Sequence, residues 1–368
     1  MNVLLLGAGH IGHTIARLLA QSEDYRVTVA DQASAALATL AALPLRTARL
    51  DTGDTSALAA LLDAHDAVIN ALPYHLAVQV ATAARAAHCH YFDLTEDVAA
   101  TRAIMALAAN ADTAFMPQCG LAPGFIGIVA HHLAQSFDRL DEIKMRVGAL
   151  PVFPTNALKY NLTWSVDGLI NEYCHSCEAI HEGALTAMLP LEGLEHFSLD
   201  GVEYEAFNTS GGLGTLCETL AGKVRTLDYK SVRYPGHRVL MQFLLSELRL
   251  AGDQGNLKAI LRRAVPTTMQ DVVLVFVTVS GERGGSFVQE VFARKIFAQR
   301  ACEDTGAEAV SAIQITTAAG VCAAVDLFRE RKLPQRGFVR QEQIALPDLL
   351  ANRFGRAYEQ SRRIESIS

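Results

Sequence analysis

The sequence predicts an α/β protein with an N-terminal Rossmann domain, built on a doubly wound parallel sheet, and a second α/β domain with a mixed or antiparallel sheet. Three observations predict it. A glycine-rich turn separates a buried strand from an amphipathic helix at the start of the chain. Strands then alternate with helices up to residue 117, and beyond residue 124 long β-branched runs replace this alternation.

Composition limits the classes of partner. Half of the 368 residues are hydrophobic and 19% are charged, so we expect packed domains. The net charge of −7 offers no electrostatic footprint for nucleic acid. Seven cysteines at irregular spacings predict no disulfide framework and fit a reducing cytoplasm. No run approaches the ~20 apolar residues of a membrane helix. A soluble, cytoplasmic protein with a small-molecule partner is expected.

The first strand, residues 3–6, leads into GAGHIG and a helix. Gly7 permits the tight turn, Gly9 lets the backbone approach a pyrophosphate, and Gly12 lets the helix pack on the strand. The helix start offers free N–H groups and partial positive charge to phosphates. We therefore predict that a dinucleotide contacts Gly7, Gly9, His10, Ile11 and Gly12.

The second strand, residues 25–30, ends at Asp31. Its carboxylate can accept hydrogen bonds from both ribose hydroxyls and would repel a 2′-phosphate. Gln32 follows, and no arginine stands in the next few positions. These residues favour NAD over NADP.

Further strands are expected at 45–50, 67–71, 90–93 and 115–117, with helices between them. Ligands of such sheets bind at the carboxyl ends of the strands. The third strand ends at Asp51, which could meet the adenine, and the fourth ends in a loop that runs into Tyr74 and His75. The expected cofactor contacts at this edge are Asp51, Asn70, Ala71, Leu72 and Pro73.

The second half of the chain has different patterns. A helix is predicted over 125–136 and strands over 143–147, 226–234 and 271–280. The run VVLVFVTVS in the last of these is continuously apolar or β-branched, so both its faces should be buried. Glycines at 281–285 predict a hairpin turn into 286–294. A helix is expected over 239–250, and a long apolar helix over 309–328.

Several motifs together resemble the saccharopine dehydrogenase and lysine 6-dehydrogenase (saccharopine reductase-like) family. They are GAGHIG, INALPYH, YFDLTED, CGLAPGF, GALPVFPTNALKYNLTWSVDGLINEY, TSGGLGTL and RYPGH, and they span nearly the whole chain. The resemblance implies a Rossmann domain over 1–122, a substrate and dimerisation domain over 123–308, and C-terminal helices over 309–368 that return to the first domain. It also implies a homodimer or a higher homo-oligomer.

The resemblance further implies an NAD-dependent oxidoreductase that acts on the C–N bond of an amino acid, with lysine 6-deamination preferred. Saccharopine dehydrogenation and a carboxynorspermidine synthase-type reduction are alternatives within the same class. In a different class, the chain could bind or sense a dinucleotide without turnover.

Amine oxidation needs a proton acceptor and a cation for the substrate carboxylate. Asp93, at a strand end, could bind the substrate ammonium, act as base or cap a turn. Lys159 could carry a proton, clamp a carboxylate or lie in solvent. His237 follows a Pro-Gly turn at the start of a helix, where a neutral imidazole is favoured, and could accept a proton or merely cap the helix.

The substrate-binding candidates are an arginine pair and two tyrosines. Strand alternation from residue 225 onward places Arg225 and Arg233 on one face, but far apart along the strand. The full set is Tyr74, Tyr160, Arg225 and Arg233. No metal is expected. Cys174, His175 and Cys177 have the spacing of metal ligands, but no second ligand pair accompanies them, and the two cysteines are predicted to be buried thiols.

Overall fold

The computed structural model describes residues 1–301 and 308–359. The chain forms two compact units. The first joins Met1–Ile128 to Gln314–Ala357, and the second comprises the described residues of Val129–Ile313 together with Tyr358 and Glu359. The segment expected to return to the Rossmann domain, 309–368, thus contributes 314–357 to the first unit, and its residues 360–368 lie outside the described part.

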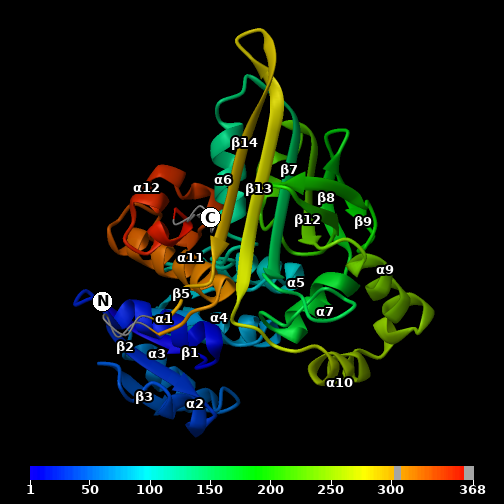
Figure 1. The fold of residues 1–368 in the computed structure, drawn as a ribbon. Coiled ribbons are helices and arrows are strands. Elements are labelled where there is room, and N and C mark those ends of the chain that lie inside the picture. Colours follow the sequence, from blue (N-terminus) through cyan, green and yellow to red (C-terminus); the bar gives the residue numbers. More distant parts are fainter. Residues whose placement is uncertain (302–307, 360–368) are drawn as a thin grey trace. The chain divides into compact units, whose positions relative to one another are not determined.

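The first unit is built on a seven-stranded sheet in which every pair of neighbouring strands is parallel. The strand order reverses at β1 and β4, as in a doubly wound sheet. Figure 1 shows its strands and helices. In sheet order the strands are β15 (Gly337–Phe338), β6 (Ala114–Met116), β5 (His90–Asp93), β4 (Ala67–Asn70), β1 (Asn2–Leu6), β2 (Arg26–Asp31) and β3 (Arg46–Arg49).

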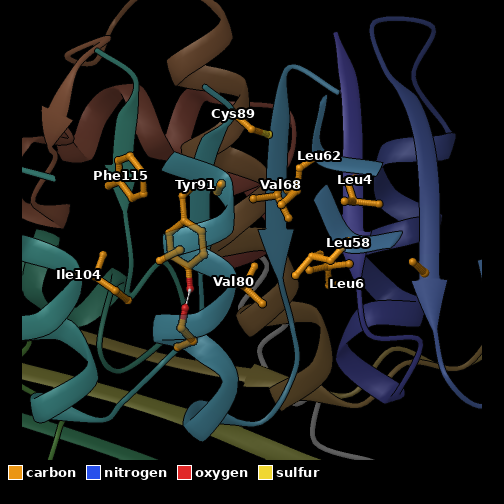
Figure 2. Packing of buried hydrophobic residues seen from close by; sticks show 14 of the residues in the cluster. Leu4, Leu6, Leu58, Leu62, Val68, Val80, Cys89, Tyr91, Ile104 and Phe115 are labelled. Atoms are coloured by element: carbon orange, nitrogen blue, oxygen red, sulfur yellow. Dashed lines mark hydrogen bonds between the residues drawn. The ribbon is translucent and has the colours of Figure 1, made fainter. Parts of the chain in front are cut away.

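Helices cover both faces of this sheet because consecutive strand residues point to opposite sides. Tyr91 packs in the cluster drawn in Figure 2, with Leu58 and Val80 from the helices on its side. Its neighbour Phe92 meets Phe328 on the opposite side, with ring centroids 5.4 Å apart. The helices of the first unit are α1 (His10–Ala20), α2 (Ser34–Ala38), α3 (Thr55–Asp63), η1 (Tyr74–Leu76), α4 (Ala77–Ala86), α5 (Val98–Ala108), α11 (Ala312–Arg329), η5 (Gln341–Gln343), α12 (Leu346–Ala351) and η6 (Gly355–Tyr358). Helix α6 (Phe125–Ala134) begins in the first unit and continues into the second.

The expectation about membrane-length runs needs one correction. Helix α11 is long and apolar enough to cross a membrane by length and composition, but it is mostly buried inside the protein. The same test is passed by core helices of soluble proteins. Its contact between Phe328 and the sheet residue Phe92 indicates a core helix.

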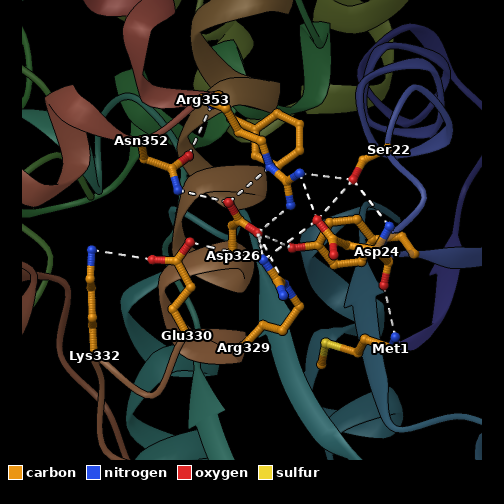
Figure 3. A network of polar contacts seen from close by, with 11 residues as sticks. Met1, Ser22, Asp24, Asp326, Arg329, Glu330, Lys332, Asn352 and Arg353 are labelled. Carbon is orange, nitrogen blue, oxygen red and sulfur yellow. Dashed lines mark hydrogen bonds and ion pairs between the residues drawn. The ribbon is translucent and has the colours of Figure 1, made fainter.

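A polar network joins the two ends of the first unit (Figure 3). Asp326 of α11 is almost wholly buried and accepts hydrogen bonds from the Tyr25 hydroxyl at 2.6 Å and from the Asn352 amide at 2.8 Å. The guanidinium groups of Arg329 and Arg353 also donate to it, at 3.1 and 2.7 Å. The carboxylate therefore ties the beginning of β2 to the returning C-terminal segment.

The second unit contains an eight-stranded sheet with the path β10-β11-β12-β7-β13-β14, and β8 and β9 branch from β12. It is mixed, since β12 and β7 are parallel and the other pairs antiparallel. The strands are β7 (Arg139–Pro151), β8 (Cys177–His181), β9 (Ala184–Met188), β10 (Glu195–Leu199), β11 (Val202–Asn208), β12 (Val224–Arg233), β13 (Asp271–Arg283) and β14 (Ser286–Phe297). The helices are α7 (Val166–Cys174), α8 (Leu216–Leu220), α9 (His237–Gln242), the π-helical η2 (Phe243–Glu247), η3 (Leu250–Gly252) and α10 (Gln254–Ala264).

Three predicted elements have different bounds. The strand expected over 143–147 is the longer β7, since it pairs with β12 on one side and β13 on the other. The helix expected over 239–250 ends at Gln242, where a π-helical turn begins. Strand β13 continues to Arg283, so the hairpin turn consists only of Gly284 and Gly285. The prediction that β13 is buried on both faces is confirmed for most of its length.

Candidate functional sites

The glycine turn between β1 and α1 has the geometry that a pyrophosphate requires. Gly7 has φ +101°, and a Cβ there would lie 2.9 Å from the Ala71 carbonyl oxygen. A Cβ on Gly12 would lie 1.9 Å from the Gly7 carbonyl oxygen, so the helix packs directly on the turn. A Cβ on Gly9, in contrast, would meet nothing within 4 Å. The open side of Gly9, beside the exposed His10, is where a ligand can approach the backbone.

Asp31 lies at the end of β2, beside this turn. One of its carboxylate oxygens accepts from the Ala8 N–H and the other from the Ala33 N–H, both at 2.7 Å. A carboxylate has about four acceptor positions, so two remain for ribose hydroxyls. Sequence reasoning missed a cation here. Arg49 of β3 pairs in register with Asp31, and its side chain is exposed.

The glycine turn gives a first prediction. Replacing Gly9 with alanine should leave the melting temperature nearly unchanged, because its φ of −69° suits alanine and the Cβ has room. The Kd for the dinucleotide should rise at least tenfold, because the methyl group occupies the side on which the pyrophosphate approaches. Titration of protein fluorescence with NAD or NADP measures this. Gly255→Ala, at the start of α10, is the control, and equal affinities in the two variants would contradict the site.

Asp93 lies at the carboxyl end of β5, as predicted, but its carboxylate is buried and occupied. It accepts from the Tyr91 hydroxyl at 2.7 Å, the Thr95 N–H at 3.0 Å and the Gln118 N–H at 2.8 Å. Burial raises the pKa of Asp93 to about 6, although these hydrogen bonds oppose the shift. The three donors link the ends of β5 and β6 to each other. This geometry favours the structural alternative, the turn cap, over a base.

The other residues predicted to contact the cofactor, and Tyr74, differ in burial and in hydrogen bonding. The buried Asn70 donates to the Tyr91 hydroxyl at 3.2 Å and accepts from the Leu72 N–H at 3.2 Å, which shapes the loop 71–73. Tyr74 begins the short helix η1 and is half-buried. The Asp51 carboxylate is exposed and accepts from the Gly53 N–H at 2.9 Å. Gln32 and Pro73 are exposed, whereas Ile11, Ala71 and Leu72 are half-buried.

In the second unit, Arg233 at the end of β12 is the centre of a buried aromatic cluster. The residue is only 3% exposed. Its guanidinium carbon lies 5.1 Å from the ring centroid of Tyr160 and 5.8 Å from that of Tyr173, within cation–π range. Its Nε donates to the Tyr173 hydroxyl at 2.9 Å and its Nη1 to the Val232 carbonyl at 2.8 Å.

Arg233 differs from the other buried cations of this unit. In the described ranges no carboxylate lies within ion-pair distance of it, whereas Arg146 is paired with Glu195 and Asp228, and Lys230 with Glu195. The buried Glu172 acts on Arg233 only at longer range, and a buried charge without a direct ion pair is costly unless a function retains it. The guanidinium is therefore the strongest candidate in this unit for binding an anionic ligand.

His237 points into the same cluster and does not cap its helix. Its Nε2 lies 3.1 Å from the Tyr173 hydroxyl and its Nδ1 2.9 Å from the Leu158 carbonyl. Since Tyr173 accepts from Arg233 and Leu158 offers only an acceptor, His237 carries its proton on Nδ1 and accepts from Tyr173 at Nε2. Burial, and then the charge of Arg233, lowers the pKa of His237 to about 3. The imidazole is a poor proton acceptor at neutral pH and instead positions Tyr173.

The cap of α9 comes from elsewhere in the sequence. The buried Glu205 of β11 accepts from the Gly236 N–H at 2.8 Å and from the Arg238 N–H at 2.6 Å. A carboxylate at a helix N-terminus stabilises it through both hydrogen bonds and charge. His237 is thereby free to turn inward.

Lys159 and Arg225 have contrasting positions. The exposed Lys159 has φ +48° and donates from Nζ to the Pro235 carbonyl at 3.0 Å, which brings it to the loop between Arg233 and His237. Arg225, at the opposite end of β12, is half-exposed and paired with Asp141 at 2.7 Å and Glu182 at 3.1 Å. The structure thus groups Tyr160, Arg233 and His237, with Lys159 beside them, but not Arg225. We withdraw Arg225 as a substrate-binding residue, because two carboxylates already neutralise it.

Sequence reasoning missed Tyr173, which connects Arg233 to His237. It belongs to the buried stripe Val166, Leu169, Ile170 and Tyr173 on α7. The helical spacing of that stripe was visible in the sequence. It indicated which face of the helix is buried, but not which strand lies against it.

Two family models match the chain. The model for the saccharopine dehydrogenase NADP binding domain matches residues 3–116, and that for the saccharopine dehydrogenase C-terminal domain matches residues 120–356. Together they cover both the glycine turn and the Arg233 cluster. They support a nucleotide cofactor, without determining whether it is NAD or NADP.

Two solved structures match nearly the whole chain. Apo saccharopine dehydrogenase (L-Glu forming) from Saccharomyces cerevisiae has 18% sequence identity and a TM-score of 0.77, over 95% of this chain and 96% of the other. The C. glutamicum DAP dehydrogenase in complex with DAP has 12% identity and a TM-score of 0.49, over 98% of this chain and 99% of the other. The first likeness confirms the predicted fold class, a Rossmann sheet with a second mixed sheet.

Proposed function

The chain belongs to the saccharopine dehydrogenase family of NAD(P)-dependent oxidoreductases, which act on CH–NH donors, and we propose that it oxidatively deaminates lysine at the 6-amino group with NAD. The observation that carries this proposal is the number of buried cations that form no ion pair with a protein carboxylate and can therefore bind a substrate carboxylate. Of the buried cations described in the second unit, Arg146 and Lys230 form ion pairs with protein carboxylates, whereas Arg233 forms none and interacts with the buried Glu172 only at longer range. One such cation suits the single carboxylate of lysine better than the three carboxylates of saccharopine.

In this proposal Arg233 binds the substrate carboxylate. Its Nε is already held by Tyr173, which His237 holds in turn, so the guanidinium is pre-organised before substrate arrives. The rings of Tyr160 and Tyr173 flank it and exclude water, which strengthens a charge-assisted hydrogen bond. His237 acts as a positioning residue.

The ammonium of lysine must lose a proton before the C–N bond is oxidised. Among Asp93, His237 and Lys159, the first is occupied by three donors and the second has a pKa near 3. We propose that Lys159, acting as the neutral amine, accepts this proton and passes it to solvent, since the residue is exposed and its positive φ, costly for a non-glycine residue, is retained beside the cluster. A bound nicotinamide would accept the hydride from Cε, and water would then attack the imine carbon.

An absorbance assay at the nicotinamide band tests the function. Purified protein is mixed with NAD or NADP and with lysine, saccharopine or other diamino acids. Reduction of the nucleotide with lysine, together with release of ammonia, is the expected result. Turnover with saccharopine and not with lysine would replace the proposal by the saccharopine alternative. Dinucleotide binding without turnover of any of these would favour a binding or sensing protein.

Asp31→Ser tests the proposed use of NAD. The serine removes the carboxylate that repels a 2′-phosphate, while the exposed Arg49 remains next to it in the sheet. The ratio of kcat/KM for NAD to that for NADP should fall by at least tenfold. Initial rates at fixed lysine measure it, and Asp63→Ser, at an exposed carboxylate at the end of α3, is the control. An unchanged ratio in Asp31→Ser would show that Asp31 does not contact the ribose.

A further inference from the structure

Helix α7 brings a second buried charge to the Arg233 cluster. Glu172, the neighbour of Tyr173 on this helix, is only 7% exposed. Its backbone carbonyl accepts from the Ser210 N–H at 3.0 Å, so the loop that follows β11 fixes the end of the helix that carries it. Keeping a carboxylate in the interior has a desolvation cost, and neither the proton transfer to Lys159 nor the binding of the substrate carboxylate uses this side chain. Glu172 is therefore a candidate for a function of its own.

The side chains on one face of β12 locate this charge. Tyr229 and Arg233 lie on the same face, because four residues separate them along a strand. Tyr173 of α7 lies against that face, where its hydroxyl accepts from Arg233 at 2.9 Å. Burial, and then the charge of Glu172, raises the pKa of Tyr229. Burial lowers the pKa of Arg233, but the tyrosines of the cluster and Glu172 outweigh it and raise that pKa. The carboxylate thus lies close to this face, within electrostatic reach of the guanidinium.

The two opposite charges are held near each other without direct contact. The guanidinium is fixed by its hydrogen bonds to the Tyr173 hydroxyl and the Val232 carbonyl, and the Tyr160 ring lies beside it. Glu172 acts on it only at longer range. An amino acid carries its carboxylate and its α-ammonium on the same carbon, so one molecule can meet both charges with charge-assisted hydrogen bonds. A molecule that lacks one of these groups compensates only one of the two charges.

We propose that Glu172 binds the α-ammonium of the substrate while Arg233 binds its carboxylate, so that Glu172 selects α-amino acids over ω-amino acids. The inference rests on the proposed function, because it assigns a second charged group of the same substrate. It also explains which amine reacts. With both groups on the α-carbon held, the 6-amino group is the one left for oxidation.

The fluorescence of Trp164 measures binding without turnover. Its Nε1 donates to the Tyr160 hydroxyl at 3.1 Å, so a ligand at Arg233 should change its emission. The two ligands are lysine and 6-aminohexanoate, which has the same chain and carboxylate but no α-amino group. Wild-type protein should bind lysine at least about tenfold more tightly. Glu172→Gln removes the charge and keeps the shape, so it should raise the Kd for lysine by at least about tenfold and that for 6-aminohexanoate by less than about threefold.

Controls separate this effect from a structural one. Glu192→Gln, at an exposed carboxylate 3.7 Å from Arg238, should leave both Kd values unchanged. Circular dichroism spectra show whether Glu172→Gln is folded. Glu172→Asp keeps the charge and should retain a preference for lysine.

The outcomes distinguish this inference from the proposed function. Equal affinity of wild-type protein for lysine and 6-aminohexanoate would overturn the inference without any variant. An equal rise of both Kd values in Glu172→Gln would also overturn it, because Glu172 would then only compensate the charge of Arg233. Either result leaves lysine as the substrate if the nucleotide is still reduced. If wild-type protein neither binds nor oxidises lysine, the proposed function fails and this inference fails with it.

Discussion

Replacing Arg233 with methionine lowers kcat/KM for lysine by about 10² to 10⁴, equivalent to about 3–5 kcal/mol, because the substrate carboxylate loses a charge-assisted hydrogen bond in a desolvated site. The protein itself should not lose comparable stability. Removing a buried charge that has no ion-pair partner relieves its desolvation cost, and methionine keeps most of the side-chain volume. Initial-rate kinetics and thermal unfolding of the same preparation separate the two effects.

The matched control is Arg225→Met, at the other end of the same strand. That arginine is half-exposed and paired with Asp141 and Glu182, so activity should change by less than about twofold. A substrate comparison sharpens the test. Wild-type protein should prefer lysine to the diamine that lacks its carboxylate, and Arg233→Met should lose this preference. If Arg233→Met keeps the preference, the carboxylate binds elsewhere.

The parts of the nucleotide site that sequence could predict are those built from neighbouring residues. Gly7, Gly9 and Gly12 lie within one strand–turn–helix segment, so their spacing already specifies the local geometry. Arg49 was missed for the opposite reason. It comes near Asp31 only through the register of β2 and β3, which no local pattern encodes.

The Arg233 cluster illustrates the same limit. The sequence predicted a Pro-Gly turn that delivers His237 to a helix start, and it left open whether the imidazole caps the helix. The outcome depends on Glu205, which lies on another strand and supplies the cap. Likewise, Asp93 was correctly placed at a strand end, but the donor Gln118 comes from the end of the next strand of the sheet. Roles that depend on long-range partners required the structure.

Asp326→Asn should destabilise the first unit by about 2–3 kcal/mol, because Arg329 and Arg353 lose hydrogen bonds to a buried charged acceptor and keep Asp24 as their shared partner. The sole tryptophan, Trp164, lies in the second unit, so its fluorescence follows that unit in urea, while far-ultraviolet circular dichroism follows both. We expect the midpoint of the circular dichroism transition to move to a lower urea concentration and the midpoint of the fluorescence transition to stay unchanged. Asp348→Asn, a half-exposed carboxylate 3.6 Å from Lys332, should change neither by more than about 0.5 kcal/mol.

The pH dependence follows from the same contacts. Although burial opposes it, hydrogen bonds from Arg353, Tyr25 and Asn352 lower the pKa of Asp326 to about 2, from 3.8 in the unfolded chain. A carboxyl with a lowered pKa contributes stability above its unfolded value and loses it as the pH falls through its folded value. The contribution, about 2 kcal/mol, should therefore be complete above pH 4 and vanish towards pH 2. The difference in free energy of unfolding between wild type and Asp326→Asn should become smaller as the pH falls from 4 to 2. A constant difference would show that the carboxylate acts by shape and not by charge.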